Sequence, residues 1–144
     1  MKTRIILTLF IALLFLNFSK TMAQSDSTKD TPTTDKLVVV WTSDDPNVAD
    51  KVALMYTHAA KKAGWFKEVT LIIWGPSAKL TAENTKIQEK LKAMQKDGVV
   101  IEACIACASA YGVTENLKSL GFVVKPMGKP LTDYLKSGAK VLTF

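Results

Sequence analysis

Cys104 and Cys107 are the residues of this sequence best suited to chemistry, because a thiolate is a strong nucleophile. They are the only two cysteines of the chain, and they stand three residues apart. The β-branched run that begins at Val99 predicts a buried strand over 99–103, and the small residues over 106–111 predict a short helix. Cys104 is therefore expected at a strand-to-helix junction, where the backbone N–H groups and the dipole of a helix favour a thiolate.

The second thiol, one helical turn further on, gives the pair several chemical interpretations. Cys107 can resolve a persulfide or a mixed disulfide on Cys104, or close a disulfide with it. The structural alternative is that both cysteines are buried small hydrophobes or an inert staple, and so short a loop adds little stability. No side-chain cation is evident near Cys104, and Glu102 would oppose its ionisation if it lies close. A metal site is not expected, because zinc takes four ligands and only His58 remains as a further candidate.

The first 35 residues are expected to lie outside the folded domain. Residues 1–23 have a basic start, an apolar run and small residues before a cleavage site, which together are typical of a secretory signal peptide. The apolar run is too short for a comfortable transmembrane helix, and no later segment resembles one. Residues 24–35 are polar and predict a disordered linker. The protein is therefore expected to be exported, either periplasmic or secreted, with no membrane span after cleavage.

The charge pattern argues against nucleic-acid binding. The formal net charge is +6, but three of the basic residues, Lys2, Arg4 and Lys20, would leave with the signal peptide. The remaining lysines are scattered among acidic residues, and Arg4 is the only arginine of the sequence. Nucleic-acid binders concentrate their basic residues and favour arginine for phosphate and base contacts.

Residues 36–144 predict one α/β domain in which strands and helices alternate. Continuous apolar runs indicate strands that are buried on both faces, as in a parallel sheet. Strands are expected at 37–41, 69–74, 99–103, 122–125 and 140–144. Helices are expected at about 46–63, 81–96, 106–111, 114–120 and 130–137, from their caps and glycine stops. This order predicts a three-layer α/β/α sandwich around a mostly parallel five-stranded sheet.

Helical periodicity predicts which side chains face the sheet. The apolar face of the first helix comprises Val48, Val52, Met55, Tyr56 and Ala59. The apolar face of the second comprises Ile87, Leu91 and Met94. A serine or an acidic residue ahead of Pro46 is expected to cap the first helix, which explains the adjacent Asp44 and Asp45 without a catalytic role.

A site is expected beyond the carboxyl ends of the strands, near the point where the strand order reverses. With the order 2-1-3-4-5, that point lies between the first and third strands, and Cys104 faces the loop that follows the first strand. The expected pocket-lining residues are Ser43, Asp44, Trp74, Gly75, Pro76 and Met127. A glycine-rich phosphate loop and a Walker lysine are both missing from the sequence, so no nucleotide cofactor is expected.

Residues 36–144 resemble the DsrE/DsrF-like family, which includes sulfur-relay proteins of sulfur oxidation and of tRNA thiolation. The resemblance rests on the strand–helix order and on the segment Cys104-Ile-Ala-Cys-Ala-Ser-Ala-Tyr-Gly-Val113. Cys104 matches the persulfide-carrying cysteine of the sulfur-relay members, and Gly112 and Val113 match the turn after the helix. Cys107 is an addition, because those members generally have a small residue there. The signal peptide is a second departure, so cytoplasmic partners are not carried over.

The resemblance implies an exported protein that handles sulfane sulfur, with Cys104 as the persulfide-forming thiol and Cys107 as a candidate resolving thiol. Its implied partners are a sulfur donor or acceptor protein or a small thiol, and a homo-oligomer is expected. Two alternatives stay open. One is a non-catalytic domain that binds a ligand or partner and has structural cysteines. The other is a periplasmic thiol–disulfide oxidoreductase, which would require Cys107 as strictly as Cys104.

Overall fold

The structure, a computed structural model, describes residues 35–144. The predicted signal peptide and all but the last residue of the predicted linker lie outside the described residues. The strands are β1 (Lys36–Trp41), β2 (Glu68–Ile73), β3 (Val100–Cys104), β4 (Val123–Lys125) and β5 (Lys140–Thr143). The helices are α2 (Pro46–Val48), the π-helical η1 (Ala49–Ala53), α3 (Leu54–Lys62), α4 (Ser77–Glu83), α5 (Thr85–Lys96), α6 (Ile105–Ala110), α7 (Thr114–Ser119) and α8 (Gly128–Lys136). In this part of the chain, no helix is long and apolar enough to cross a membrane.

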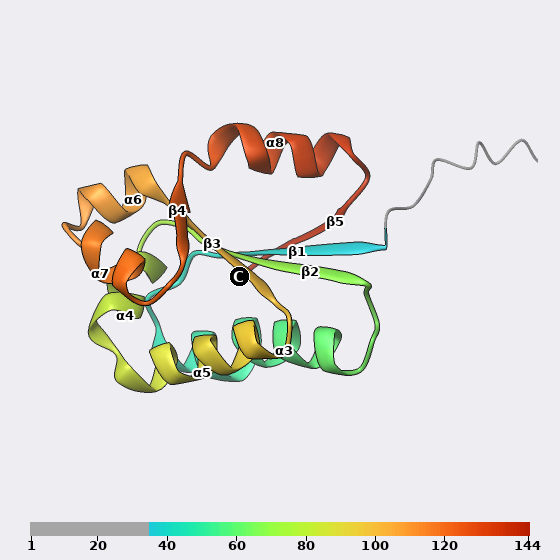
Figure 1. The fold of residues 1–144 in the computed structure, drawn as a ribbon, viewed down its shortest axis with the longest axis horizontal. Coiled ribbons are helices and arrows are strands. Elements are labelled where there is room, and N and C mark those ends of the chain that lie inside the picture. Colours follow the sequence, from blue (N-terminus) through green and yellow to red (C-terminus); the bar gives the residue numbers. More distant parts are fainter. Residues whose placement is uncertain (1–34) are drawn as a thin grey trace, which may run out of the picture. The chain divides into compact units, whose positions relative to one another are not determined.

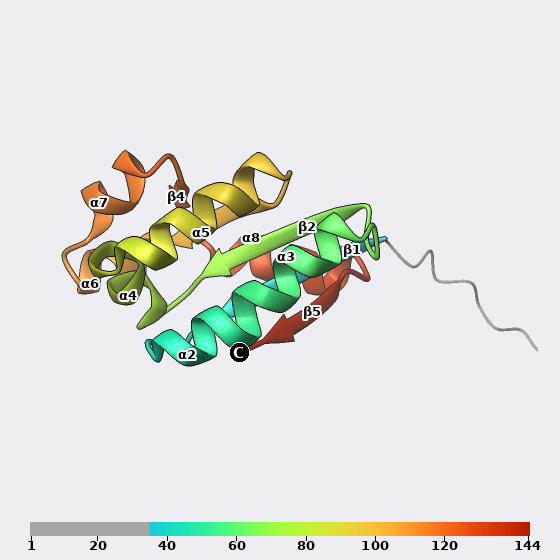
Figure 2. The ribbon, with the colours of Figure 1, turned by 90° about the horizontal axis from the view of Figure 1, so that it is seen from below.

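The five strands form one all-parallel sheet in the order β4-β3-β2-β1-β5. α8 covers one face of the sheet, and α3 and α5 cover the other (Figure 1). The view from below shows α3 and α5 in front of the sheet and α8 behind it (Figure 2). α4, α6 and α7 gather beyond the carboxyl ends of the strands. The predicted three-layer α/β/α architecture is therefore confirmed.

The strand order differs from the predicted 2-1-3-4-5. β3 pairs with β2, while β1 pairs with β2 and β5. The predicted order would leave β2 at an edge, yet its side chains from Val69 to Ile73 are all buried. Such an apolar strand is stable only in the interior of a sheet that is covered on both faces. The shorter and more exposed β4 and β5 take the two edges instead.

The correct order moves the point where the connections diverge. After β3, the chain enters α6 and α7, which bury Ala108 and Leu117 in the core shared with α3 and α5. After the neighbouring β4, the chain enters α8 on the opposite face. The connections of β3 and β4 therefore part at the carboxyl end of β3, which is where open α/β sheets form their sites. Cys104 is the last residue of β3.

The alternation of side chains along each strand divides the interior into two cores. On β1, Leu37, Val39 and Trp41 belong to the larger core, which also receives the buried residues of α3 and α5. Val38 and Val40 point to the other face and belong to a smaller cluster under α8. Both faces of β1 are thus buried, which is the physical reason for its continuous apolar sequence.

The first helix presents a different face to the sheet from the one predicted. Its buried residues are Ala49, Ala53, Leu54, Thr57 and Ala60. Val52 and Met55, predicted to face inward, are 41% and 55% exposed. The π-helical turn η1 explains the error, because its wider hydrogen bonding rotates the later residues relative to a regular 3.6-residue period. The inward face of α5, with Ile87, Leu91 and Met94, is confirmed.

β5 occupies the edge of the sheet beside β1. Hydrogen bonds between the residues that follow the two strands hold it there. Val38 lies opposite Val141 in the parallel register. Past the strand, the Thr42 amide and hydroxyl donate to the Phe144 carbonyl at 2.7 and 2.8 Å. The Phe144 ring packs against Tyr56 of α3, with the ring centroids 6.5 Å apart. Residues from the end of the chain therefore complete both the sheet edge and the larger core.

Candidate functional site

The two cysteines lie where β3 passes into α6. Cys104 ends the strand in an extended conformation and is the residue that precedes the first turn of α6. Cys107 follows within α6, one turn further along. Both are free thiols. Cys104 is only 5% exposed, whereas Cys107 is partly exposed. The predicted strand-to-helix junction is therefore present, and Cys107 is the thiol nearer to solvent.

The environment of Cys107 favours the protonated form of its thiol. Burial raises the pKa of this thiol, and a hydrogen bond with Cys104 raises it further. A backbone hydrogen bond with Gly75 acts in the opposite direction by favouring the thiolate. Gly75 has a φ of +66°, in the left-handed region that favours glycine. The turn after β2 thus brings its backbone to the cysteine pair, and the two sulfurs are close enough to interact.

Part of the predicted pocket lining surrounds the pair. Cys104 packs in the smaller cluster with Val40, Ile72 and the fully buried Met127. Trp74 and Cys107 pack against the same cluster from its rim. Pro76 is exposed in the turn just after Gly75. Trp74, Gly75 and Met127 therefore lie near the thiols. That they line a pocket there stays a prediction.

Ser43 and Asp44 belong to a different part of the sheet edge. They follow β1, and β2 separates β1 from β3. The Ser43 hydroxyl accepts from the Asp45 amide at 3.1 Å. Asp45 rather than Asp44 caps the helix, because its Oδ1 accepts from Asn47 N at 2.7 Å. Ser43 therefore shapes the turn into α2, and Asp44 is exposed beside it. The expectation that they face Cys104 rested on the strand order that the structure does not have.

Sequence reasoning named Glu102 but missed the polar group that it forms beneath the thiols with Lys125 and Tyr134. Glu102 is two residues before Cys104 on β3, so both side chains point to the α8 face of the sheet. Its carboxylate is buried, with 7% of the side chain exposed. Lys125 Nζ lies 2.5 Å from Glu102 Oε1, and the Tyr134 hydroxyl of α8 donates to Oε2 at 3.2 Å. A charged residue, Glu102, inside an otherwise apolar strand was the sequence signal for this group. Its partners Lys125 and Tyr134 come from β4 and α8, so the sequence pattern of β3 did not reveal them.

Lys125 also corrects the expectation that no side-chain cation lies near Cys104. It is the direct neighbour of Cys104 in the parallel register of β3 and β4. Residues paired in this way direct their side chains to the same face. The hydrogen bond to Glu102 raises the pKa of Lys125, so the ammonium form is favoured. Burial and the nearby Glu102 charge raise the pKa of the Tyr134 hydroxyl, which therefore stays protonated.

Comparison with known proteins shows the family of this chain. The sequence profile of the DsrE/DsrF-like family matches residues 35–144. The chain belongs to the DsrE/DsrF-like family. The match covers the whole sheet and the segment with both cysteines. No curated protein matched the chain.

Two solved structures share the DsrE-like fold. One is a conserved protein of unknown function from Bacteroides thetaiotaomicron, with 40% identity and a TM-score of 0.73. That match covers 76% of this chain and 95% of the other. The second is the ychN protein from E. coli, with 18% identity and a TM-score of 0.60, over 77% of this chain and 99% of the other. The second likeness shows the fold alone.

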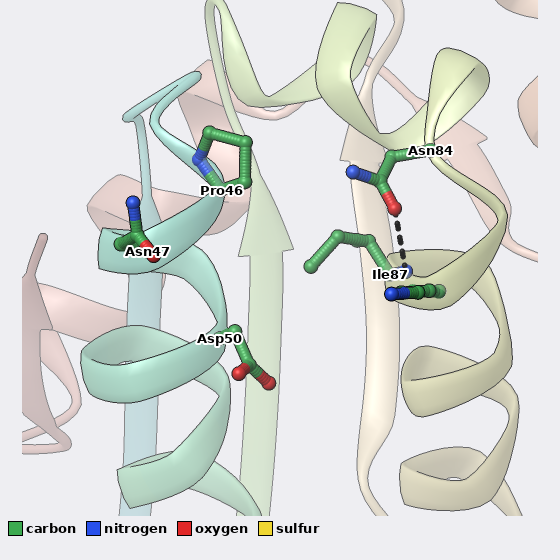
Figure 3. Close-up of a pocket in the computed structure, with 6 residues that line it drawn as sticks. Pro46, Asn47, Asp50, Asn84 and Ile87 are labelled. Carbon is green, nitrogen blue, oxygen red and sulfur yellow. Dashed lines mark hydrogen bonds between the residues drawn. The ribbon is translucent and has the colours of Figure 1, made fainter.

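A pocket of about 230 Å³ lies on another part of this DsrE-like domain. It is lined by Pro46, Asn47, Asp50, Asn84, Lys86 and Ile87 (Figure 3). Neither cysteine borders it, and the Asn84 side chain already accepts from Ile87 N at 3.1 Å. Lys51 and Lys90 lower the pKa of Asp50 to about 2. The pocket is therefore formed by residues at the starts of helices and by an acidic residue already in an ion pair. The two thiols, Cys104 and Cys107, lie in another part of the domain.

The arrangement of acids, histidine and thiols in this domain offers little to a metal ion. Within residues 35–144, no group of three or more such side chains is placed to hold one. His58, the predicted third candidate, is on α3 with its Nε2 2.6 Å from Asp97 Oδ2. It therefore serves a surface contact between α3 and the end of α5, apart from the cysteines. The reactive groups described at the site are the two thiols.

Proposed function

We propose that this DsrE-like protein accepts and passes on sulfane sulfur, with Cys104 as the persulfide-forming thiol and Cys107 as the resolving thiol. The observation that carries the proposal is the pair of free thiols that lie close together, one helical turn apart, at the carboxyl end of β3. Two thiols one helical turn apart are suited to exchange of a sulfur atom between them. Membership of the DsrE/DsrF-like family supports a sulfur-relay role.

The uptake step is a thiolate attack on a sulfane sulfur. The Cys104 thiolate forms an S–S bond to a terminal sulfur of an inorganic polysulfide dianion, while the adjacent S–S bond breaks. The products are a Cys104 persulfide anion and a polysulfide dianion that is shorter by one sulfur. Charge and sulfur balance without an external oxidant. A donor protein that carries a persulfide would react in the same way and leave as a thiolate.

Cys107 completes the cycle in one of two ways. Attack of its thiolate on the outer sulfur moves the sulfane sulfur from Cys104 to the more exposed position. Attack on the inner sulfur forms a Cys104–Cys107 disulfide and releases hydrosulfide, after which a dithiol reductant must restore the pair. The partial exposure of Cys107 and the burial of Cys104 support an outward transfer to an acceptor.

Intact mass spectrometry tests the proposal directly. Protein purified without reductant is exposed to inorganic polysulfide, alkylated and weighed, alongside Cys104→Ser, Cys107→Ser and the double variant. We expect the parent and Cys107→Ser to gain the mass of one sulfur, reversibly with reductant, and Cys104→Ser to gain none. Peptide mapping then places the added sulfur on Cys104.

The other outcomes point to the alternatives. Uptake that survives in Cys104→Ser but disappears in Cys107→Ser would reassign the persulfide to Cys107. A parent protein two hydrogens lighter than the reduced chain, with no sulfur uptake, would indicate a closed disulfide. Its reduction potential would then separate an oxidoreductase from a structural staple. Reduced thiols that never react would favour the non-catalytic binding domain.

The proposed setting is outside the cytoplasm, with a small thiol or a protein as donor or acceptor. The basic, apolar and small-residue pattern of residues 1–23 supports export. Fractionation of cells that express the full-length chain tests this, because export requires a shortened protein in the periplasmic or secreted fraction. We also propose a homo-oligomer, and light scattering of the purified protein measures its mass in solution.

A further inference from the structure

Burial of the Glu102 carboxylate inside the sheet has a high free-energy cost. It stands on an interior strand of the sheet under α8, and only 5% of the residue is exposed. A carboxylate removed from water costs several kcal/mol unless charges and hydrogen bonds compensate it. A hydrophobic residue at the same place would serve packing at least as well. The ion pair that Glu102 forms therefore calls for a role beyond stability.

Lys125 is the partner placed to serve both Glu102 and Cys104. It pairs with Cys104 across β3 and β4, and Glu102 pairs with Val123 two residues earlier. Neighbouring strands lie about 4.8 Å apart, so the long Lys125 stem starts directly beside Cys104. The side chain is 37% exposed, which leaves its ammonium at the rim of the buried cluster. Because the lysine stem is long and flexible, its ammonium can reach toward the sulfur as well as toward the carboxylate.

We propose that Lys125 is the counter-ion of ionised Cys104, and that Glu102 holds the Lys125 ammonium while Cys104 is neutral and competes with the thiolate for it once Cys104 is ionised. This inference deepens the proposed function and rests on it for its purpose, since the thiolate and the persulfide are the anions to be stabilised. When Cys104 loses its proton to solvent, Lys125 is shared between two anions. When Cys104 is neutral, the pair with Glu102 leaves no net charge in the cluster.

Each charged or titratable neighbour of this cluster contributes in a known direction. From β3, the Glu102 carboxylate opposes ionisation of Cys104. From β4, Lys125 favours it. Cys107 of α6 and Tyr134 of α8 are neutral while protonated. From β1, Lys36 places its ammonium 4.7 Å from the centre of the Tyr134 ring and forms an ion pair with Glu68, so its charge is already compensated.

Titration of Cys104 in a set of matched variants tests the inference. All variants carry Cys107→Ser, so that one thiol remains. Thiolate absorbance in the ultraviolet is followed against pH, and the same variant with Cys104→Ser supplies the background. Glu102→Gln removes the opposing charge and frees Lys125, so the Cys104 midpoint should fall by about one pH unit. Adding Lys125→Met to Glu102→Gln should raise the midpoint again by about one unit.

Two further variants separate charge from packing. Glu102→Gln with Lys125→Arg keeps the cation and should hold the midpoint of Glu102→Gln. Glu102→Gln with Lys62→Met removes a lysine from the end of α3, on the other face of the sheet, and should leave that midpoint unchanged. Both comparisons start from the Glu102→Gln protein, so neither leaves a buried carboxylate unpaired, and circular dichroism checks that each variant folds.

Equal midpoints in Glu102→Gln with and without Lys125→Met would overturn the inference. So would a shift of the same size from Lys62→Met, since that would reflect net charge alone. Sulfur uptake by the same proteins, measured by mass, keeps the two proposals apart. Midpoints that move as expected with no sulfur uptake would sink the proposed function and leave the counter-ion role standing. Uptake with unmoved midpoints would do the reverse.

Discussion

The two faces of the sheet are packed by different kinds of residues. The side under α3 and α5 is closed by aliphatic and aromatic residues such as Leu71, Leu91 and Trp41, all inaccessible to solvent. The side under α8 has fewer buried apolar residues and includes a carboxylate, a lysine, a tyrosine hydroxyl and a thiol. A single helix covers it, and that helix has no fully buried residue.

This difference indicates that one face of the sheet mainly supplies stability and the other holds the reactive and charged groups. Burial of apolar surface is the main stabilising term in folding, so the larger core should dominate the stability of the domain. The smaller cluster gives up apolar contacts for polar groups that must satisfy one another. Because both cores share the same strands, the larger apolar core helps to position Cys104 and Glu102 although its own residues carry no reactive group.

The largest expected effect comes from the apolar side. Leu71 lies in the middle of the sheet, between Val39 and Ile101, and is fully buried. Leu71→Ala should destabilise the domain by about 3 kcal/mol, from lost burial and the cavity left behind. Denaturant unfolding measures the change. Leu131→Ala, at a partly buried position against the α8-side cluster, should cost clearly less; equal costs would remove the distinction between the two sides.

The ion pair on the α8 side gives the next largest effect. Lys125→Met leaves the buried Glu102 carboxylate without its cation, which should cost about 2 kcal/mol near neutral pH. Glu102→Met with Lys125→Met removes both charges and should recover most of that loss. Urea unfolding of the two variants decides the matter. A double variant as unstable as Lys125→Met would show that packing, and not the unpaired charge, sets the cost.

The smallest expected effect concerns the thiol nearer to solvent. Burial and Cys104 raise the pKa of Cys107 above its usual value of 9.0. The folded protein therefore binds this proton more tightly than the unfolded chain, and stability should decrease as pH rises above 9.0. The rate of Cys107 alkylation against pH should have its midpoint above that value. Cys104→Ala should move the midpoint down; a midpoint below the usual value in the parent would contradict the described environment.

Local patterns in the sequence predicted much of the fold. The β-branched runs of β1, β2 and β3 showed burial on both faces, and Pro46 after an acidic residue marked the start of the first helix. Ile87, Leu91 and Met94 showed the inward face of α5. The junction between strand and helix at Cys104 followed from the same reasoning. Each of these features depends on residues that are close in the sequence.

The wrong predictions concern features that depend on contacts between segments far apart in the sequence. The partner of each strand depends on which edge is better buried, so the predicted strand order was wrong, and with it the reason for placing Ser43 and Asp44 beside Cys104. The π-helical turn in the first helix has no clear mark in its sequence and rotated the inward face away from Met55. Lys125 escaped notice because it comes from another strand, which the register alone brings beside Cys104.

The pairing of β5 with β1 has a consequence for the synthesis of the protein. β1 is made first, yet its outer edge finds its partner only when residues 140–143 have left the ribosome. Until then, the nascent sheet exposes a long, apolar strand edge of the kind that pairs with other chains. Closing so long a loop also makes this contact one of the slowest to form. Chaperone binding to the emerging chain would therefore matter most until residues 140–143 can pair with β1.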